Sequence, residues 1–106
     1  MSDYKKSSED AEHGERGELL LVRGKDSAMR KWVETPEVNS KKSSHAHPYE
    51  TLGYVIQGKA MLYIEGAEIE LKRGDSWVVP AQTEHHYEIM SDFEAVEVTT
   101  PPARES

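Results

Sequence analysis

The chain has 106 residues, enough for one domain with a single modest hydrophobic core. Its 20 acidic residues outnumber its 13 basic ones, and the formal net charge of −7 argues against nucleic acid or an anionic membrane surface as a partner. The sequence contains no cysteine, which excludes disulfides, thiolate metal ligands and cysteine nucleophiles. Small molecules or other proteins are therefore the expected partners.

The first 17 residues differ in composition from the rest of the chain. Residues 1–17 hold one aromatic side chain and little else that could be buried, so we expect a flexible N-terminal tail. An edge strand within an oligomer remains an alternative for this segment. It lacks the apolar stretch of a signal peptide, and no later apolar run is long enough to span a membrane. These features make the cytoplasm the expected location.

From Glu18 onward, short apolar stretches alternate with turn residues. The expected strands, in chain order, cover residues 19–22, 29–33, 51–56, 60–64, 69–71, 77–79, 87–90 and 93–98. A tight hairpin turn is expected at Glu65-Gly66, and a longer polar loop at Pro36 and over residues 39–44. No stretch has a helical period. The pattern predicts an all-β sandwich or barrel over residues 18–102, followed by a C-terminal tail at 103–106.

Four of the five histidines fall in two short clusters, His45 with His47 and His85 with His86. In an extended chain, residues two apart point to the same side, so His45 and His47 should aim at one place. Imidazole suits iron, zinc, copper and nickel, and a third ligand from another strand would complete an open metal site. On this spacing alone, a pair of exposed histidines before a proline turn remains an alternative.

The segments around these histidines resemble the two motifs of the cupin superfamily. The segment from His45 to Gly58 has an HxH, a short gap, a strand and a glycine; the segment from Gly74 to His85 has a glycine, a strand, a proline and a histidine. The 15 residues between the motifs can form two strands and a hairpin. The resemblance implies a single jelly-roll (cupin) barrel with a metal inside it.

The resemblance also implies a ligand set for a divalent metal ion such as iron, zinc, nickel or manganese. Carried over by position, His45, His47 and His85 are the metal ligands. The slot that usually holds a glutamate or glutamine falls on Thr51, whose hydroxyl is a poor ligand for a divalent ion. The neighbouring Glu50 should point to the other face of its strand, unless a bulge turns it inward. Otherwise water or substrate would fill the open positions.

Several aromatic side chains could line a substrate pocket, although most aromatics in a small β protein belong to the core. The pocket candidates are Tyr49, Tyr54, Tyr63, Trp77 and Tyr87.

Three further positions have specific expectations. His86 should face away from His85 if the strand is regular. Glu97 should face away from Val96 and Val98, and the simpler expectation is a solvated side chain rather than a carboxylate that supports a histidine. Gln82 stands where the family usually has a glycine, so this turn should use a conformation that a side chain accepts.

Cupins host many activities, so the sequence leaves the reaction open, as well as the question whether the protein is an enzyme. One hypothesis is a metal-dependent enzyme that converts a small polar molecule, such as a sugar acid, or uses oxygen. Another is a non-catalytic binding or sensing module with a reduced metal site, which Thr51 favours. A metal-free storage cupin is disfavoured because storage cupins usually carry two barrels. Free strand edges predict a homodimer.

Overall fold

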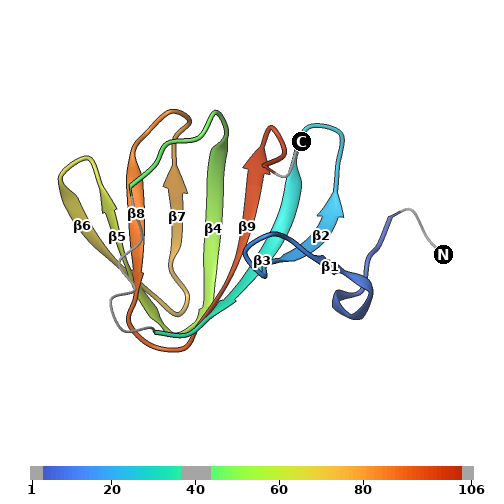
Figure 1. The fold of residues 1–106 in the computed structure, drawn as a ribbon, viewed down its shortest axis with the longest axis horizontal. Coiled ribbons are helices and arrows are strands. Elements are labelled where there is room, and N and C mark those ends of the chain that lie inside the picture. Colours follow the sequence, from blue (N-terminus) through green and yellow to red (C-terminus); the bar gives the residue numbers. More distant parts are fainter. Residues whose placement is uncertain (1–3, 37–43, 104–106) are drawn as a thin grey trace.

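A computed structural model describes residues 4–36 and 44–103, and its regular structure is almost entirely β-sheet (Figure 1). One short 3-10 helix, η1 (Ser8–Asp10), comes before the strands. The strands are β1 (Glu12–His13), β2 (Leu19–Arg23), β3 (Ala28–Glu34), β4 (Glu50–Gln57), β5 (Lys59–Ile64), β6 (Ala67–Lys72), β7 (Ser76–Val79), β8 (His85–Ile89) and β9 (Phe93–Thr100). Among the described residues, no helix has the length and apolar character to cross a membrane.

The strands form two antiparallel sheets. The six-stranded sheet has the order β1-β2-β3-β9-β4-β7, and the three-stranded sheet has the order β6-β5-β8. The hydrophobic core contains side chains from both sheets: Val55, Val79, Phe93 and Ala95 from the larger, and Ala60, Leu62, Leu71 and Ile89 from the smaller. The all-β prediction is confirmed.

The eight expected strands are all present, and their bounds agree with the sequence pattern to within two residues. The hairpin between β5 and β6 turns at Glu65 (φ 50°) and Gly66 (φ 81°), the left-handed pair that a two-residue hairpin requires. Most of the loop expected over residues 39–44, and residues 104–106 of the expected C-terminal tail, lie outside the described residues.

Part of the N-terminal segment takes a place in the larger sheet. Strand β1 pairs with β2, with Glu12 opposite Leu20 and His13 opposite Leu19. The turn between the two strands is closed by backbone bonds from Gly14 N to Glu18 O (2.7 Å) and from Gly17 N to Gly14 O (3.1 Å). A two-residue strand has no hydrophobic pattern, so the sequence did not indicate it. Whether residues 1–17 are mobile stays a prediction.

The outer face of the larger sheet carries an apolar patch. Strand β4 alternates, with Gly53 and Val55 pointing inward and Leu52 and Tyr54 pointing outward. The cross-strand register places Leu52 between Val98 of β9 and Val78 of β7. Leu52, Tyr54 and Val78 are each about half exposed (51%, 50% and 48%). We call Leu52, Tyr54, Val78 and Val98 the outer patch.

Candidate metal centre

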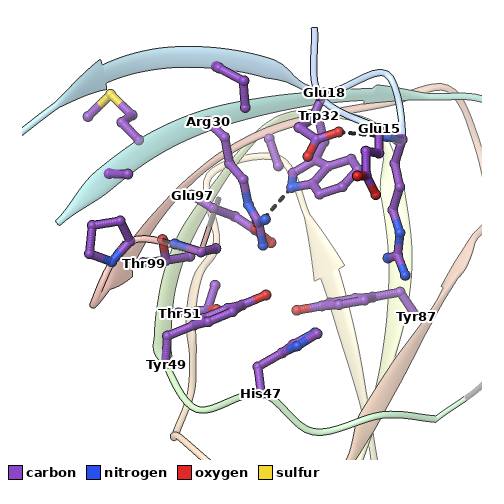
Figure 2. Close-up of a pocket in the computed structure, with 18 of the residues that line it drawn as sticks. Glu15, Glu18, Arg30, Trp32, His47, Tyr49, Thr51, Tyr87, Glu97 and Thr99 are labelled. Atoms are coloured by element: carbon purple, nitrogen blue, oxygen red, sulfur yellow. Dashed lines mark hydrogen bonds and ion pairs between the residues drawn. The ribbon is translucent and has the colours of Figure 1, made fainter. Parts of the chain in front are cut away.

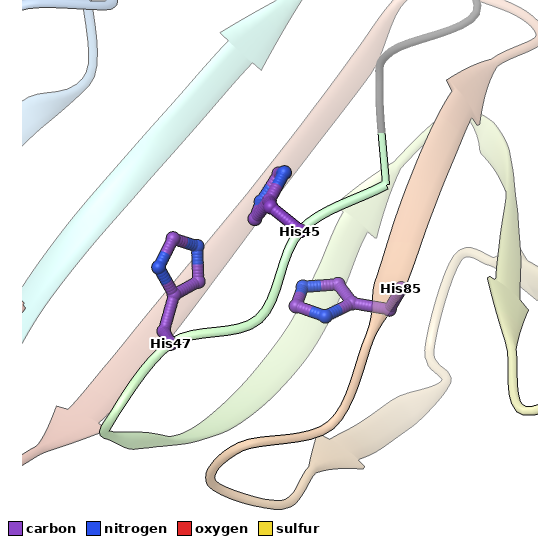
Figure 3. Close-up of side chains that lie close together, drawn as sticks. All are labelled: His45, His47 and His85. Atoms are coloured by element: carbon purple, nitrogen blue, oxygen red, sulfur yellow. The ribbon is translucent and has the colours of Figure 1, made fainter.

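Three histidines from two segments converge at one place (Figure 3). His45 and His47 come from the stretch before β4, and His85 is the first residue of β8. Their candidate ligand nitrogens all lie within 4.8 Å of one another. The ring centroids are 4.5 Å apart for His45 and His47, and 5.1 Å apart for His45 and His85. Three imidazoles this close can share one ion.

Backbone hydrogen bonds tie the histidine-bearing segments together. His45 N donates to His85 O, and His85 N donates to His45 O, both at 3.0 Å. Gln82 N donates to His47 O at 2.6 Å. Gln82 itself has φ 62°, so the expectation of an ordinary conformation at this turn was wrong. Its side chain is exposed, and the bond to His47 holds a left-handed backbone that a glycine would adopt without strain.

The tautomer of His85 is set by the backbone. Nδ1 of His85 lies 2.9 Å from the carbonyl oxygen of Thr83. A carbonyl oxygen can only accept, so Nδ1 carries the proton in the neutral ring. The lone pair of Nε2 is then available to an ion, and the bond to Thr83 fixes the orientation of the ring.

The surroundings of His47 favour its neutral form. Burial lowers the pKa of its imidazole to about 4, with further lowering by His45, His85, Arg30 and Arg16. Because a histidine must be neutral to bind a metal, this environment favours the ligand form over a wide pH range. The donor set therefore fits a divalent ion.

In the metal-free protein, we expect the His47 imidazole to titrate near pH 4 rather than near 6.5. The unfolded chain takes up this proton at a higher pH than the folded chain. The contribution of His47 to stability should therefore be complete above about pH 6.5 and be lost progressively as the pH falls towards 4. An NMR titration measures the midpoint, and thermal unfolding should show a smaller acid loss in His47→Gln. A midpoint near 6.5 would contradict this expectation.

The position beside the histidines is occupied by Thr51 and not by a carboxylate. Thr51 is only 5% exposed and faces the interior, whereas Glu50 is exposed on the other face of β4. Within the part of the chain that the structure describes, the cluster that could hold an ion consists of the three histidines alone. At Glu50 and Thr51, strand β4 therefore alternates regularly, as expected, and no bulge turns Glu50 inward.

The histidines open onto a cavity of about 880 Å³ (Figure 2). Of the aromatic pocket candidates, Tyr49, Trp77 and Tyr87 line it. Tyr54 and Tyr63 do not line this cavity. Tyr54 points outward from β4, and Tyr63 stacks on His86 at 4.6 Å between ring centroids.

Strand alternation explains why these two tyrosines lie outside the cavity. Strand alternation turns Tyr54 away from its inward neighbours Gly53 and Val55. It also turns His86 away from His85, as expected, and Tyr63 lies directly opposite His86 in the register. Tyr63 donates to Glu88 Oε1 at 2.8 Å.

A family model for the cupin domain matches residues 32–100. The chain belongs to the cupin family.

Solved structures of other cupins and related proteins share the fold. An RmlC-like cupin from Shewanella frigidimarina superposes with a TM-score of 0.83 at 22% identity, covering 98% of this chain and 95% of that one. KdgF from Halomonas sp. has a TM-score of 0.74 at 22% identity, with 92% and 93% covered. BH2720 from Bacillus halodurans has a TM-score of 0.75 at 13% identity, with 83% and 72% covered. No curated protein matches the chain. At these identities the likeness shows the fold alone.

One wall of the cupin cavity is an indole packed on a glycine. Gly53 of β4 lies opposite Trp77 of β7, and a Cβ at position 53 would overlap the indole ring. The indole Nε1 donates to the Tyr87 hydroxyl at 3.1 Å. Burial, followed by the charge of Glu97, raises the pKa of Tyr87 well above its usual range. Tyr87 therefore keeps its proton, which makes it a hydrogen-bond donor and not a base.

The cavity contains a buried ion pair that was not predicted from the sequence. Glu97 is 5% exposed, and its Oε1 accepts from Arg30 Nε and from Trp32 Nε1, both at 2.9 Å. The expectation that Glu97 is solvated was wrong. It does face away from Val96 and Val98, but those valines lie on the outer face, so Glu97 points into the cavity.

The sequence held one signal for this pair. Residues 29–33 alternate, so Arg30 and Trp32 had to share a face of their strand. That face is the inner one: Arg30 lies opposite Glu97 in the register, and both line the cavity.

Proposed function

We propose that this cupin binds a divalent metal ion through His45, His47 and His85, and that it binds or converts a small polar molecule such as a sugar acid at that ion. The convergence of three ligand nitrogens within 4.8 Å carries the proposal. A bound ion would act as a Lewis acid on an oxygen of the ligand. The cavity of about 880 Å³ is within the range of small-molecule sites.

The residues around the histidines support this assignment. Thr51 lines the same cavity as the three histidines, and an ion held by three histidines would keep positions open for an oxygen of water or of the small molecule. Tyr87 accepts from Trp77, which leaves its own proton to be donated into the cavity. Tyr49 stacks on His47 at 4.6 Å with an interplanar angle of 8°, so its ring restricts the motion of that ligand.

A non-catalytic binding or sensing module is the second candidate. The observation that favours it is Thr51, because the cluster lacks the carboxylate or amide ligand usual in the family. The two candidates differ in turnover. Catalytic conversion that disappears in His85→Ala, with folding intact, would exclude the sensing module.

The decisive experiment is metal analysis of protein purified under metal-replete conditions. We expect about one ion per chain in the wild type and much less in His85→Ala. Loss of this ligand should lower the metal affinity by more than the roughly 10–100-fold that is typical when a residue around a metal ligand is changed. His86→Ala is the matched control, because His86 is the adjacent histidine but faces away from the cluster. Equal metal content in the two variants would disprove the proposed ligand set.

A homodimer also remains a proposal, and the outer patch is the surface that would bury apolar area in it. Contiguous exposed apolar side chains mark interaction sites, and a two-fold axis lets one patch meet itself. We expect Leu52→Lys to shift the protein towards monomer in sedimentation velocity. Ile69→Lys on β6, which is 41% exposed, is the control and should leave the distribution unchanged. A monomeric wild type at high micromolar concentration would contradict the proposal. A cytoplasmic location stays a prediction.

A further inference from the structure

We propose that the ligand of this cavity carries a carboxylate, and that Arg30 and Arg16 bind this carboxylate beside the three histidines. The inference rests on the proposed metal function and adds the chemical class of the ligand. Both arginines lie outside residues 32–100, the part that matches the family model. The selectivity of the cavity would therefore come from the N-terminal part of this chain and not from the motifs shared with other cupins.

Arg30 is held rigidly in the cavity. Its side chain is 18% exposed, and its Nε donates to Glu97 Oε1 at 2.9 Å. Its Cζ lies 5.1 Å from the ring centroid of Trp32 and 5.8 Å from that of Tyr49. A guanidinium carries five N–H donors in a planar fork, and a bond from Nε to one oxygen leaves donors for a ligand. A planar fork is well matched to a carboxylate.

Glu97 orients this guanidinium. Its Oε1 accepts from Trp32 as well as from Arg30, so the carboxylate is fixed at 2.9 Å from each of two donors. A guanidinium that is already oriented loses less freedom when it binds a ligand. Glu97 is thus a positioning residue, and Arg30 is the residue that would touch the ligand.

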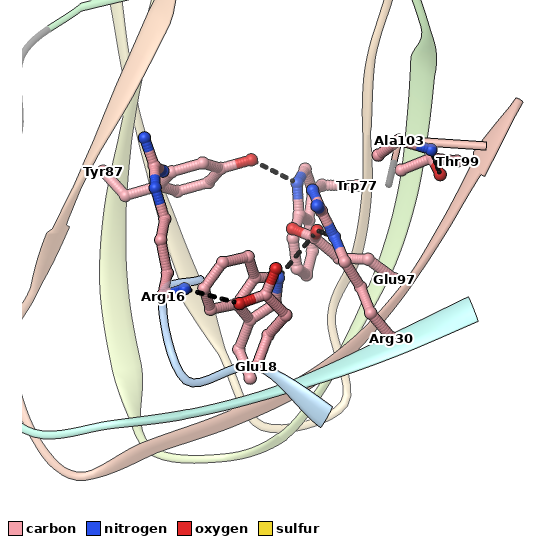
Figure 4. A network of polar contacts seen from close by, with 9 residues as sticks. Arg16, Glu18, Arg30, Trp77, Tyr87, Glu97, Thr99 and Ala103 are labelled. Atoms are coloured by element: carbon pink, nitrogen blue, oxygen red, sulfur yellow. Dashed lines mark hydrogen bonds and ion pairs between the residues drawn. The ribbon is translucent and has the colours of Figure 1, made fainter. Parts of the chain in front are cut away.

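Arg16 brings a second positive charge to the same cavity. It lies in the turn between β1 and β2, where its backbone N donates to Glu18 Oε1 at 3.0 Å. Its side chain lines the cavity, as does Tyr87; Figure 4 shows both with the Arg30–Glu97 pair. Arg16 and Arg30 line the same cavity as the three histidines.

The histidine cluster adds to this positive field. With Thr51 in place of a carboxylate, three neutral imidazoles would leave an ion with its full double charge. Four glutamates also line the cavity, but Glu97 is paired with Arg30 and Glu18 is bonded to the backbone of Arg16. The other two are Glu15, in the turn between β1 and β2, and Glu34, the last residue of β3. The charge of such an ion would suit an anionic oxygen at its open position.

The test compares acids with their neutral counterparts on the full chain loaded with Zn²⁺. D-glucuronate and D-glucose differ in having a carboxylate or a hydroxymethyl group, and glycolate and ethylene glycol form a second such pair without a sugar ring. We expect calorimetry to show at least one acid binding about 10-fold or more tightly than its neutral counterpart.

Variants assign that preference to the arginines. Arg16→Gln should weaken acid binding about 10-fold while Zn²⁺ affinity stays within about 3-fold, because an exposed side chain is lost and no ligand is touched. Arg30→Lys should do the same, because lysine keeps the charge beside Glu97 but lacks the planar fork. Arg73→Gln is the control and should bind like the wild type, because Arg73 is exposed in a turn and does not line the cavity.

The outcomes separate the two proposals. If both acids bind no better than their neutral counterparts, or if Arg16→Gln and Arg30→Lys both bind acid as the wild type does, the carboxylate site is disproved while the metal function stands. If the wild type does not bind Zn²⁺ at all, the proposed function itself fails. Should Arg30→Lys not fold, Arg16→Gln alone decides, since residue 16 is exposed and its substitution leaves the core intact.

Discussion

Replacing Glu97 by glutamine should lower the free energy of unfolding by about 3 kcal/mol, the low end of what is typical when one partner of a buried ion pair is removed. The substitution keeps the shape of the side chain but leaves the guanidinium of Arg30, whose side chain is only 18% exposed, without its counter-charge. The lower figure is appropriate because water still reaches part of Arg30. Urea unfolding followed by circular dichroism measures the change.

Glu94→Gln is the matched control on the same strand. Glu94 pairs with Lys31 at 3.3 Å, and both side chains are more than a quarter exposed (29% and 28%). An exposed pair of this kind contributes only about 0–1 kcal/mol. Adding Arg30→Met to Glu97→Gln should recover part of the lost stability, because no buried charge then remains. Equal losses in Glu97→Gln and Glu94→Gln would contradict the burial argument.

Gly53→Ala should destabilise the fold by about 1–3 kcal/mol, which is the usual effect of overfilling a packed site. The added methyl group would overlap the indole of Trp77, so the ring must move away from β4. That movement would also break the bond from Trp77 to the Tyr87 hydroxyl. The near-ultraviolet circular dichroism of the tryptophans should change together with the unfolding free energy.

Two further variants test the cause of this loss. Gly24→Ala should stay within about 0.5 kcal/mol of the wild type, because a Cβ at position 24 would meet only Ser27 O at 3.7 Å. Trp77→Phe added to Gly53→Ala should cost less than the sum of the two single changes, since the smaller ring removes the overlap. If the losses of unfolding free energy simply add, overlap with the indole is not the cause of the loss in Gly53→Ala.

The strands and the histidine cluster could be predicted because their signals are local. An alternation of period two identifies a strand such as β4, and the spacing of His45, His47 and His85 within two motifs predicts their convergence. What alternation does not reveal is which face is the inner one. Val96 and Val98 suggested a buried face of β9, yet both valines lie on the outer face of the larger sheet, next to Leu52 and Tyr54 of β4. Glu97 was therefore expected on the wrong side of the sheet.

Other features depend on tertiary contacts that have no local signature. Strand β1 has two residues, Glu12 and His13, and only its pairing with β2 defines it. Arg16 reaches the cavity because of the turn between these two strands. Gln82 adopts a left-handed backbone although its side chain disfavours it, because its N–H bonds to His47 O across two loops.

The backbone bonds that join His45 to His85 and Gln82 to His47 have a consequence for metal choice. These bonds involve only backbone atoms, so the polypeptide holds the histidine-bearing segments together without an ion. The metal should then bind to a chain that is already folded. Zinc fingers differ, because in them metal binding drives folding. Three imidazoles without a carboxylate impose little selectivity, so affinities should rise along the Irving–Williams series from manganese to copper. The ion carried in a cell would then reflect which metal that cell supplies.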